Sequence, residues 1–96
     1  MGNITFDCDP QKAQSNLAKH CVSFEEAQTV FLDENARLID DPDHSKEEER
    51  FVLLGYSFQG RCLVVHHCYR ESDAVIRLIS ARRATAREEE EYWSFQ

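Results

Sequence analysis

Two runs rich in β-branched and aromatic residues decide the fold: RCLVVHHCY at residues 61–69 and AVIRLISA at residues 74–81. Residues of these types favour extended backbone, and the polar segment 71–73 between the runs is typical of a turn. The two runs therefore predict an antiparallel hairpin. Residues 50–58 have the same character and lead into the hairpin through a two-residue turn at 59–60, so three consecutive antiparallel strands are expected.

Two helices are expected before these strands. Asp9 followed by Pro10 supplies an N-cap and a first-turn proline, and the apolar spacing after them predicts a helix over residues 10–20. Ser23 is followed three residues later by a glutamate, which is a capping-box signal. A second helix is therefore expected over residues 24–32.

The remaining segments complete an α+β layer fold. Residues 36–40 predict a short strand, and turn residues and an acidic loop follow it. Another capping box begins at Thr85 and predicts a C-terminal helix with aromatic residues at its end. We therefore expect a single domain, 1–96, in which two N-terminal helices pack on a curved antiparallel sheet of about four strands, with a C-terminal helix.

Composition narrows the class of protein. The 96 residues, 42% of them hydrophobic, can build one core and no second one. The chain has neither a signal-peptide pattern at its start nor an apolar stretch of about 18 residues, so no membrane association is expected. Four cysteines without a dense framework indicate reduced thiols. These features predict a cytoplasmic protein.

The charge is unevenly distributed. A net charge of -7 argues against nucleic-acid binding by the whole surface, because that affinity depends on cations that neutralise phosphates. Residues 61–87, however, contain few acidic residues and six arginines: Arg61, Arg70, Arg77, Arg82, Arg83 and Arg87. Arginine suits bidentate phosphate contacts. This segment therefore predicts a local cationic patch suited to phosphate groups, although the arginines could instead pair with the acidic runs 47–49 and 88–91.

The hairpin also suggests a catalytic pair. If Arg70 faces Ala74, His67 lies opposite Arg77. Metal-independent RNA cleavage needs a base for the ribose 2′-hydroxyl, cations for the phosphorane and an acid for the leaving oxygen. A histidine beside an arginine matches that need. The alternative is that His67 is a hydrogen-bonded sheet histidine and Arg77 an ion-pair partner.

The same register groups further polar residues. It places Arg61 and Arg83 together at the far end of the His67 face, and it gives the opposite face four polar side chains: His66, Arg70, Ser80 and Arg82.

Other polar residues have two interpretations each. Lys19 and His20 could contact RNA or simply complement the dipole at a helix end. Tyr92 could position a phosphate or belong to the core. Three residues share one strand face by parity and raise the alternative of a metal site: Cys62, His66 and Cys68. Their spacing is poor for a closed zinc site, so neither a metal nor another cofactor is expected.

Five short motifs occur in order along the chain: DPxKAxxN at 9–16, KHxVSFEEA at 19–27, DPDHS at 41–45, EER at 48–50 and IRxISARxA at 76–84. Through them the sequence resembles the BrnT family of ribonuclease toxins from type II toxin–antitoxin pairs. The resemblance implies a RelE-like fold, RNA cleavage that blocks translation and growth, and neutralisation by a BrnA-like antitoxin in a hetero-oligomer able to bind operator DNA.

The resemblance and the arginine-rich segment together give the expected site. The candidate catalytic residues are His67, Arg77, Arg82, His20 and Tyr92. The candidate RNA-binding residues are Lys19, Arg61, Arg70 and Arg83.

The sequence departs from the family pattern at three cysteines. Cys21 replaces a usual glycine, and Cys8 and Cys68 replace residues that are often aromatic and threonine, respectively. A second hypothesis is therefore a catalytically degenerate toxin homologue that acts as the binding module of a transcriptional repressor complex.

Overall fold

The computed structural model describes residues 4–41, 49–70 and 74–95. The elements in chain order are β1 (Thr5–Asp7), α1 (Pro10–His20), α2 (Phe24–Thr29), the 3-10 helix η1 (Val30–Leu32), β2 (Arg37–Asp40), β3 (Phe51–Tyr56), β4 (Cys62–Arg70), β5 (Val75–Arg83) and α3 (Ala86–Ser94). All the expected helices and strands are present, and the α+β fold class is confirmed. The expected turn at 71–73 and the loop residues 42–48 lie outside the described residues.

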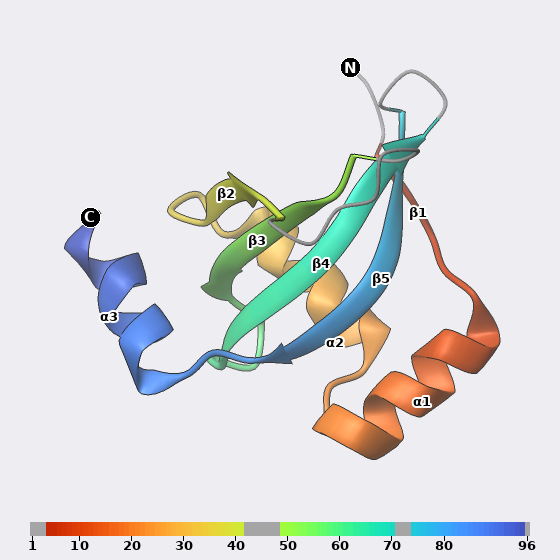
Figure 1. Ribbon diagram of the computed structural model, residues 1–96, viewed down its shortest axis with the longest axis horizontal. Helices are drawn as coiled ribbons and strands as arrows, with labels where there is room; N and C mark the ends of the chain where they lie inside the picture. Colours follow the sequence, from red (N-terminus) through yellow and green to blue (C-terminus); the bar gives the residue numbers. More distant parts are fainter. Residues whose placement is uncertain (1–3, 42–48, 71–73, 96) are drawn as a thin grey trace.

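The sheet has one strand more than expected. Its order is β1-β5-β4-β3-β2, and the strands twist across the molecule (Figure 1). Consecutive strands from β2 to β5 are antiparallel, as predicted, whereas β1 pairs in parallel with β5 from Thr5 opposite Val75 to Asp7 opposite Arg77. The sheet is therefore mixed and five-stranded rather than antiparallel with about four strands.

Each helix begins at its expected cap. The Asp9 side chain accepts a hydrogen bond from the backbone N–H of Gln11, and Ser23 accepts one from Glu26. Thr85 and Glu88 form the reciprocal capping box of α3. None of the helices in the described ranges has the length and apolarity needed to cross a membrane.

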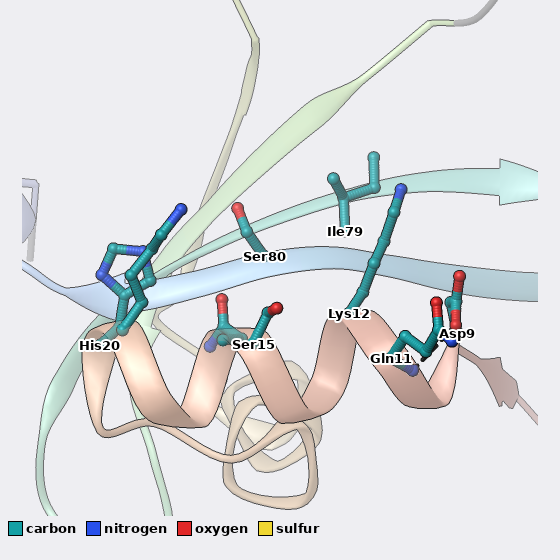
Figure 2. A pocket seen from close by; sticks show the side chains of 9 residues that line it. Asp9, Gln11, Lys12, Ser15, His20, Ile79 and Ser80 are labelled. Carbon is teal, nitrogen blue, oxygen red and sulfur yellow. Dashed lines mark hydrogen bonds between the residues drawn. The ribbon is translucent and has the colours of Figure 1, made fainter.

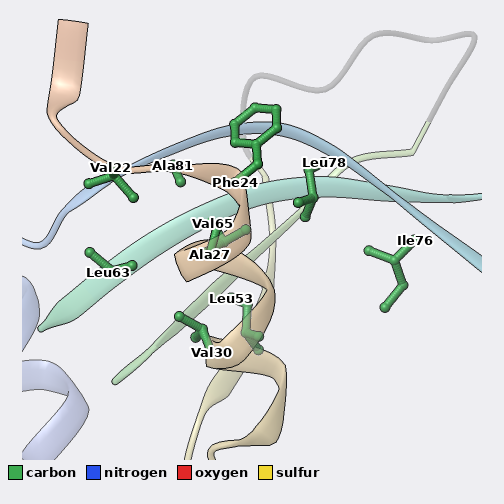
Figure 3. Close-up of a cluster of buried hydrophobic side chains, with 10 residues drawn as sticks. All are labelled: Val22, Phe24, Ala27, Val30, Leu53, Leu63, Val65, Ile76, Leu78 and Ala81. Carbon is green, nitrogen blue, oxygen red and sulfur yellow. The ribbon is translucent and has the colours of Figure 1, made fainter. Parts of the chain in front are cut away.

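The core lies on both faces of the sheet. On one face, α2, η1 and the α1–α2 connection cover the strands (Figure 3). The buried cluster between them consists of Val22, Phe24, Ala27, Val30, Leu53, Leu63, Val65, Ile76, Leu78 and Ala81. On the other face a smaller cluster lies beneath α3 and consists of Val52, Leu54, Cys62, Val64 and Tyr92. The two faces therefore carry different helices, and α3 contacts the sheet mainly at β3.

A buried asparagine joins α1 to the sheet. Asn16 Nδ2 donates to the Ala81 carbonyl at 2.8 Å and to the Val22 carbonyl at 2.9 Å, while its Oδ1 accepts from the Ala81 N–H at 2.9 Å. Asn16 is the buried residue of α1, whereas Leu17 is 52% exposed. The apolar spacing correctly predicted a helix, but a polar side chain lies at its contact with β5.

The β4–β5 register differs from the expected one. His67 lies opposite Leu78, and a bulge between His66 and His67 then places His66 opposite Ser80. The prediction that His67 faces Arg77 was therefore wrong: Arg77 lies opposite Cys68. A shift of one residue moves a side chain to the other face of a sheet. His67 and Arg77 consequently lie on opposite faces.

Candidate functional site

A group of polar side chains lies on the α3 side of the sheet, mainly on β4 and β5. Cross-strand pairs place His66 opposite Ser80, Cys68 opposite Arg77, and Val64 opposite Arg82. Directly opposed residues project on the same face, with Cβ atoms about 5 Å apart. The expected grouping on this face is confirmed, and Arg77 joins it. We define the polar sheet face as Asp41, Arg50, His66, Arg70, Arg77, Ser80 and Arg82.

His66 is oriented by a buried carboxylate. Its Nδ1 lies 2.9 Å from Oδ2 of Asp41, whose side chain is 4% exposed, while the His66 side chain is 25% exposed. Because a carboxylate only accepts, Nδ1–H is the donor. In the neutral imidazole this leaves Nε2 with a lone pair. A partly exposed histidine with one fixed tautomer can take a proton from a bound hydroxyl.

Two arginines on the polar sheet face have carboxylate partners. Arg77 Nη1 lies 3.3 Å from Asp7 Oδ2, and Arg82 makes two hydrogen bonds of 2.8 Å to Glu88. The Arg82 bonds lower the pKa of Glu88 to about 2, although burial opposes the shift. The alternative that arginines pair with the 88–91 run is therefore realised at Arg82. Both guanidiniums keep further N–H groups, since each carries five donors.

His67 does not have the geometry of an RNA-contacting residue. Its side chain is 0% exposed, its Nδ1 donates to the Val65 carbonyl at 3.1 Å, and its Nε2 lies 3.3 Å from the Tyr69 hydroxyl. The rings of Phe31 and Phe51 also pack against it. Burial lowers the pKa of His67, which favours the neutral form. His67 is the hydrogen-bonded sheet histidine of the alternative interpretation.

Lys19 and His20 lie beside a groove between α1 and β5 (Figure 2). The groove has a volume of about 460 Å³, and Ser80 of the polar sheet face also lines it. Lys19 and His20 therefore share the groove with Ser80 of the polar sheet face, whereas His67 does not line it.

The end of the sheet near α2 contains Arg61 and Arg83. Arg61 forms a bidentate ion pair with the buried Glu26, and its Nη2 also donates to the Cys21 carbonyl at 3.1 Å. Hydrogen bonding to Arg61 lowers the pKa of Glu26, and the nearby Arg83 charge contributes to the shift. Arg83 is exposed and faces Leu63 in the register. The two arginines share this end of the sheet, but Arg61 neutralises Glu26.

Metal ligation has no support in the described residues, among which no group of three or more histidine, cysteine, aspartate or glutamate side chains could hold an ion. Cys62 lies in the cluster beneath α3, where burial raises the pKa of its thiol to about 11. Cys68 is buried six residues further along β4, a distance of about 20 Å in an extended strand.

Comparison with known proteins gives the family. A family profile described as "Ribonuclease toxin, BrnT, of type II toxin-antitoxin system" matches residues 8–88. The chain belongs to the BrnT family. The crystal structure of the Brucella abortus ribonuclease toxin BrnT superposes with a TM-score of 0.66 at 21% identity, over 86% of this chain and 99% of that one, which shows a shared fold. No curated protein sequence matches significantly.

Tyr92 of this BrnT-family chain lies in the core. Its hydroxyl donates to Asp33 Oδ2 at 2.8 Å, and the residue is 3% exposed. Burial and the Asp33 contact raise the pKa of Tyr92 to about 12. Asp33 also accepts from the Tyr56 N–H, so the pair of tyrosines attaches α3 to the sheet. These contacts support the core interpretation of Tyr92.

The structure adds Arg50 to the candidate residues. Asp41 donates its backbone N–H to the Arg50 carbonyl, which continues the β2–β3 pairing and puts Arg50 on the face of Val52 and His66. Arg50 Nε is buried and has no hydrogen-bond partner in the part of the chain that the structure describes. A buried donor without an acceptor is rare in native proteins and marks this position as a candidate functional residue. The sequence signal was present, since Arg50 ends the EER motif of the BrnT resemblance.

Proposed function

We propose that this chain is a metal-independent endoribonuclease toxin whose active site is the polar sheet face. The carrying observation is the His66–Asp41 pair on the same face as Arg77, Ser80 and Arg82. His66 replaces His67 as the histidine of the expected mechanism, because His66 is partly exposed and His67 is buried. Membership of the BrnT ribonuclease toxin family supports the same activity.

The chemistry follows from the arrangement of His66. Its Nε2 takes the proton of the ribose 2′-hydroxyl while the 2′-oxygen forms a bond to phosphorus. The bond from phosphorus to the 5′-oxygen then breaks, and that oxygen takes a proton from water, which yields a 2′,3′-cyclic phosphate and a 5′-hydroxyl; His66 afterwards returns its proton to the solvent. In this proposal Arg77 and Arg50 stabilise the charge of the phosphorane. None of these steps uses a metal ion.

The direct test is cleavage by the purified chain in EDTA. We expect RNA fragments that end in 2′,3′-cyclic phosphate, and His66→Gln should lower the rate at least a hundredfold, the usual range for loss of acid–base catalysis. The control Arg87→Gln changes an exposed side chain of α3, outside the polar sheet face, and should retain most of the rate. Intact RNA with the wild type, or full activity of His66→Gln, would overturn the assignment.

The proposal includes an antitoxin. The family description assigns BrnT toxins to type II toxin–antitoxin systems, and a BrnA-like protein encoded beside this chain is the expected partner. Asp40 and Glu49 are exposed at one side of the sheet and would favour a basic partner. Co-expression should restore growth that the toxin alone arrests, and the purified hetero-oligomer should bind operator DNA.

One observation favours a second function, a binding module in a repressor complex without catalysis. Arg61, Arg77 and Arg82 each pair with a carboxylate, which reduces the positive charge offered to RNA. In that case expression without an antitoxin should not arrest growth, yet the chain should still form the DNA-binding complex. Growth arrest that His66→Gln abolishes would instead support the nuclease.

A further inference from the structure

The groove between α1 and β5 has lysines along one wall, and hydrogen bonds to the sheet hold that wall in place. Lys12, Ser15, Asn16 and Lys19 recur at spacings of three and four residues, so they lie on one side of α1. Figure 2 shows Lys12 extending from α1 toward Ile79, with Ser15 and Ser80 in the middle of the groove. The three hydrogen bonds of Asn16 hold this side of the helix against β5.

The lysines of the groove keep their charge available. Both Lys12 and Lys19 are exposed, and neither forms an ion pair among the described residues. The carboxylate that lines the groove is Asp9, at the far end of α1, where Oδ1 accepts the capping hydrogen bond from Gln11. At the other end, Arg61 binds the Cys21 carbonyl and so offsets the negative helix terminus.

The groove is continuous with the polar sheet face. Ser80 lines the groove and is also the cross-strand partner of His66. An extended ligand bound along α1 would therefore reach the His66–Asp41 pair by passing over Ser80. Lys12 and Lys19 are seven residues apart, about 10 Å along the helix, which allows contact with more than one phosphate.

The geometry points to a binding subsite for single-stranded RNA in this groove, where Lys12 and Lys19 contact phosphates that flank the phosphate cleaved beside His66. This assignment rests on the proposed nuclease function for its substrate class. It adds Lys12 and Ser15 to the residues that handle RNA. It also predicts that very short oligonucleotides bind poorly, because they cannot occupy the groove and the polar sheet face together.

The test measures binding separately from cleavage. The probe is a fluorescent 12-nucleotide 2′-O-methyl RNA, which lacks the attacking hydroxyl and stays intact. Lys12→Gln and Lys19→Gln should each weaken binding roughly three- to tenfold and lower the slope of log affinity against log salt by about 0.7. Arg87→Gln removes one positive charge from an exposed position on α3 and should change affinity less than twofold.

Cleavage kinetics distinguish the two proposals. With cleavable RNA, the lysine variants should raise KM and leave kcat near the wild-type value, because the lysines contact flanking phosphates and not the phosphate that is cleaved. Lysine variants that bind as tightly as Arg87→Gln would overturn the subsite, even if the wild type cuts RNA. Lysine-dependent binding by a chain that never cuts RNA would support the subsite and reject the nuclease.

Discussion

His66 and Asp41 are 25 positions apart in the chain, yet Nδ1 of His66 lies 2.9 Å from Oδ2 of Asp41. The carboxylate fixes the imidazole tautomer, so Asp41→Asn should slow RNA cleavage about tenfold or more while the fold persists. Asparagine is isosteric, but its amide can donate to Nδ1 and thereby favour the opposite tautomer. The measurement is kcat at saturating RNA across a pH series. Wild-type kcat in a folded Asp41→Asn variant would show that the pair has no role in the reaction.

His67 should make the stability of the fold sensitive to mild acid. Its folded-state pKa is lowered by burial, so below its ordinary value near 6.5 the unfolded chain binds a proton that the folded chain does not. The free energy of unfolding should therefore fall as the pH drops from 6.5 toward the folded pKa, by at most about 1.4 kcal/mol per pH unit from this group. His67→Leu should show a weaker dependence in urea titrations between pH 5 and 7. An unchanged slope would contradict the prediction.

Glu88→Gln should release Arg82 from its ion pair. Glutamine can keep the capping hydrogen bond of α3, so the cost in stability should stay near the ~1 kcal/mol of a surface ion pair. The freed guanidinium should strengthen binding of the 2′-O-methyl probe by roughly two- to fivefold. Glu90→Gln removes an equal charge from an exposed position of the same helix and is the control. Equal gains in the two variants would assign the effect to net charge rather than to Arg82.

The same ion pair should stabilise the fold against acid. The folded-state pKa of Glu88 is about 2 and its ordinary value is 4.5, so its contribution is complete above 4.5 and is lost as the pH falls toward 2. Thermal midpoints of wild type and Glu88→Gln should therefore differ at pH 6 and converge in strong acid. A constant difference would contradict this assignment.

Cys21→Gly should stabilise the protein. Cys21 ends α1 at φ 58 and ψ 31, in the left-handed region where a side chain costs about 1 kcal/mol or more. Thermal denaturation should show an increase of several degrees in the midpoint for a chain of this size. Cys21→Ala keeps the Cβ atom and the strained conformation, so it should not show the gain. Equal midpoints for the two variants would place no strain at this position.

The helices and most strand boundaries could be predicted because their signals are local. Asp9, Ser23 and Thr85 cap the helices as their sequence contexts indicated. The β1 strand could not be predicted in the same way, because it has three residues and depends on β5 for its hydrogen bonds. A parallel partner 70 positions away, such as Val75 for Thr5, leaves no pattern in the neighbouring sequence.

The candidate site was predicted in composition but not in geometry. The expected face with His66, Arg70, Ser80 and Arg82 exists, whereas the pair of His67 and Arg77 does not. The difference arises from a bulge and from the register near the turn, and neither is encoded by the alternation of residue types. The contact between Asp41 and His66 could not be predicted either, because it depends on the pairing of β2 with β3.

The amide of Asn16 has a consequence for how this sheet avoids association. β1 pairs with β5 only as far as Arg77, so without Asn16 the backbone N–H and C=O of Ala81 would be unpaired at the sheet edge. Unpaired backbone groups at a sheet edge can pair with a strand from another molecule. The side-chain amide of Asn16 satisfies both groups, because it donates to the C=O and accepts from the N–H. Aspartate would offer only acceptors and leucine neither partner, so asparagine at this position protects the monomer from edge-to-edge aggregation as well as anchoring a helix.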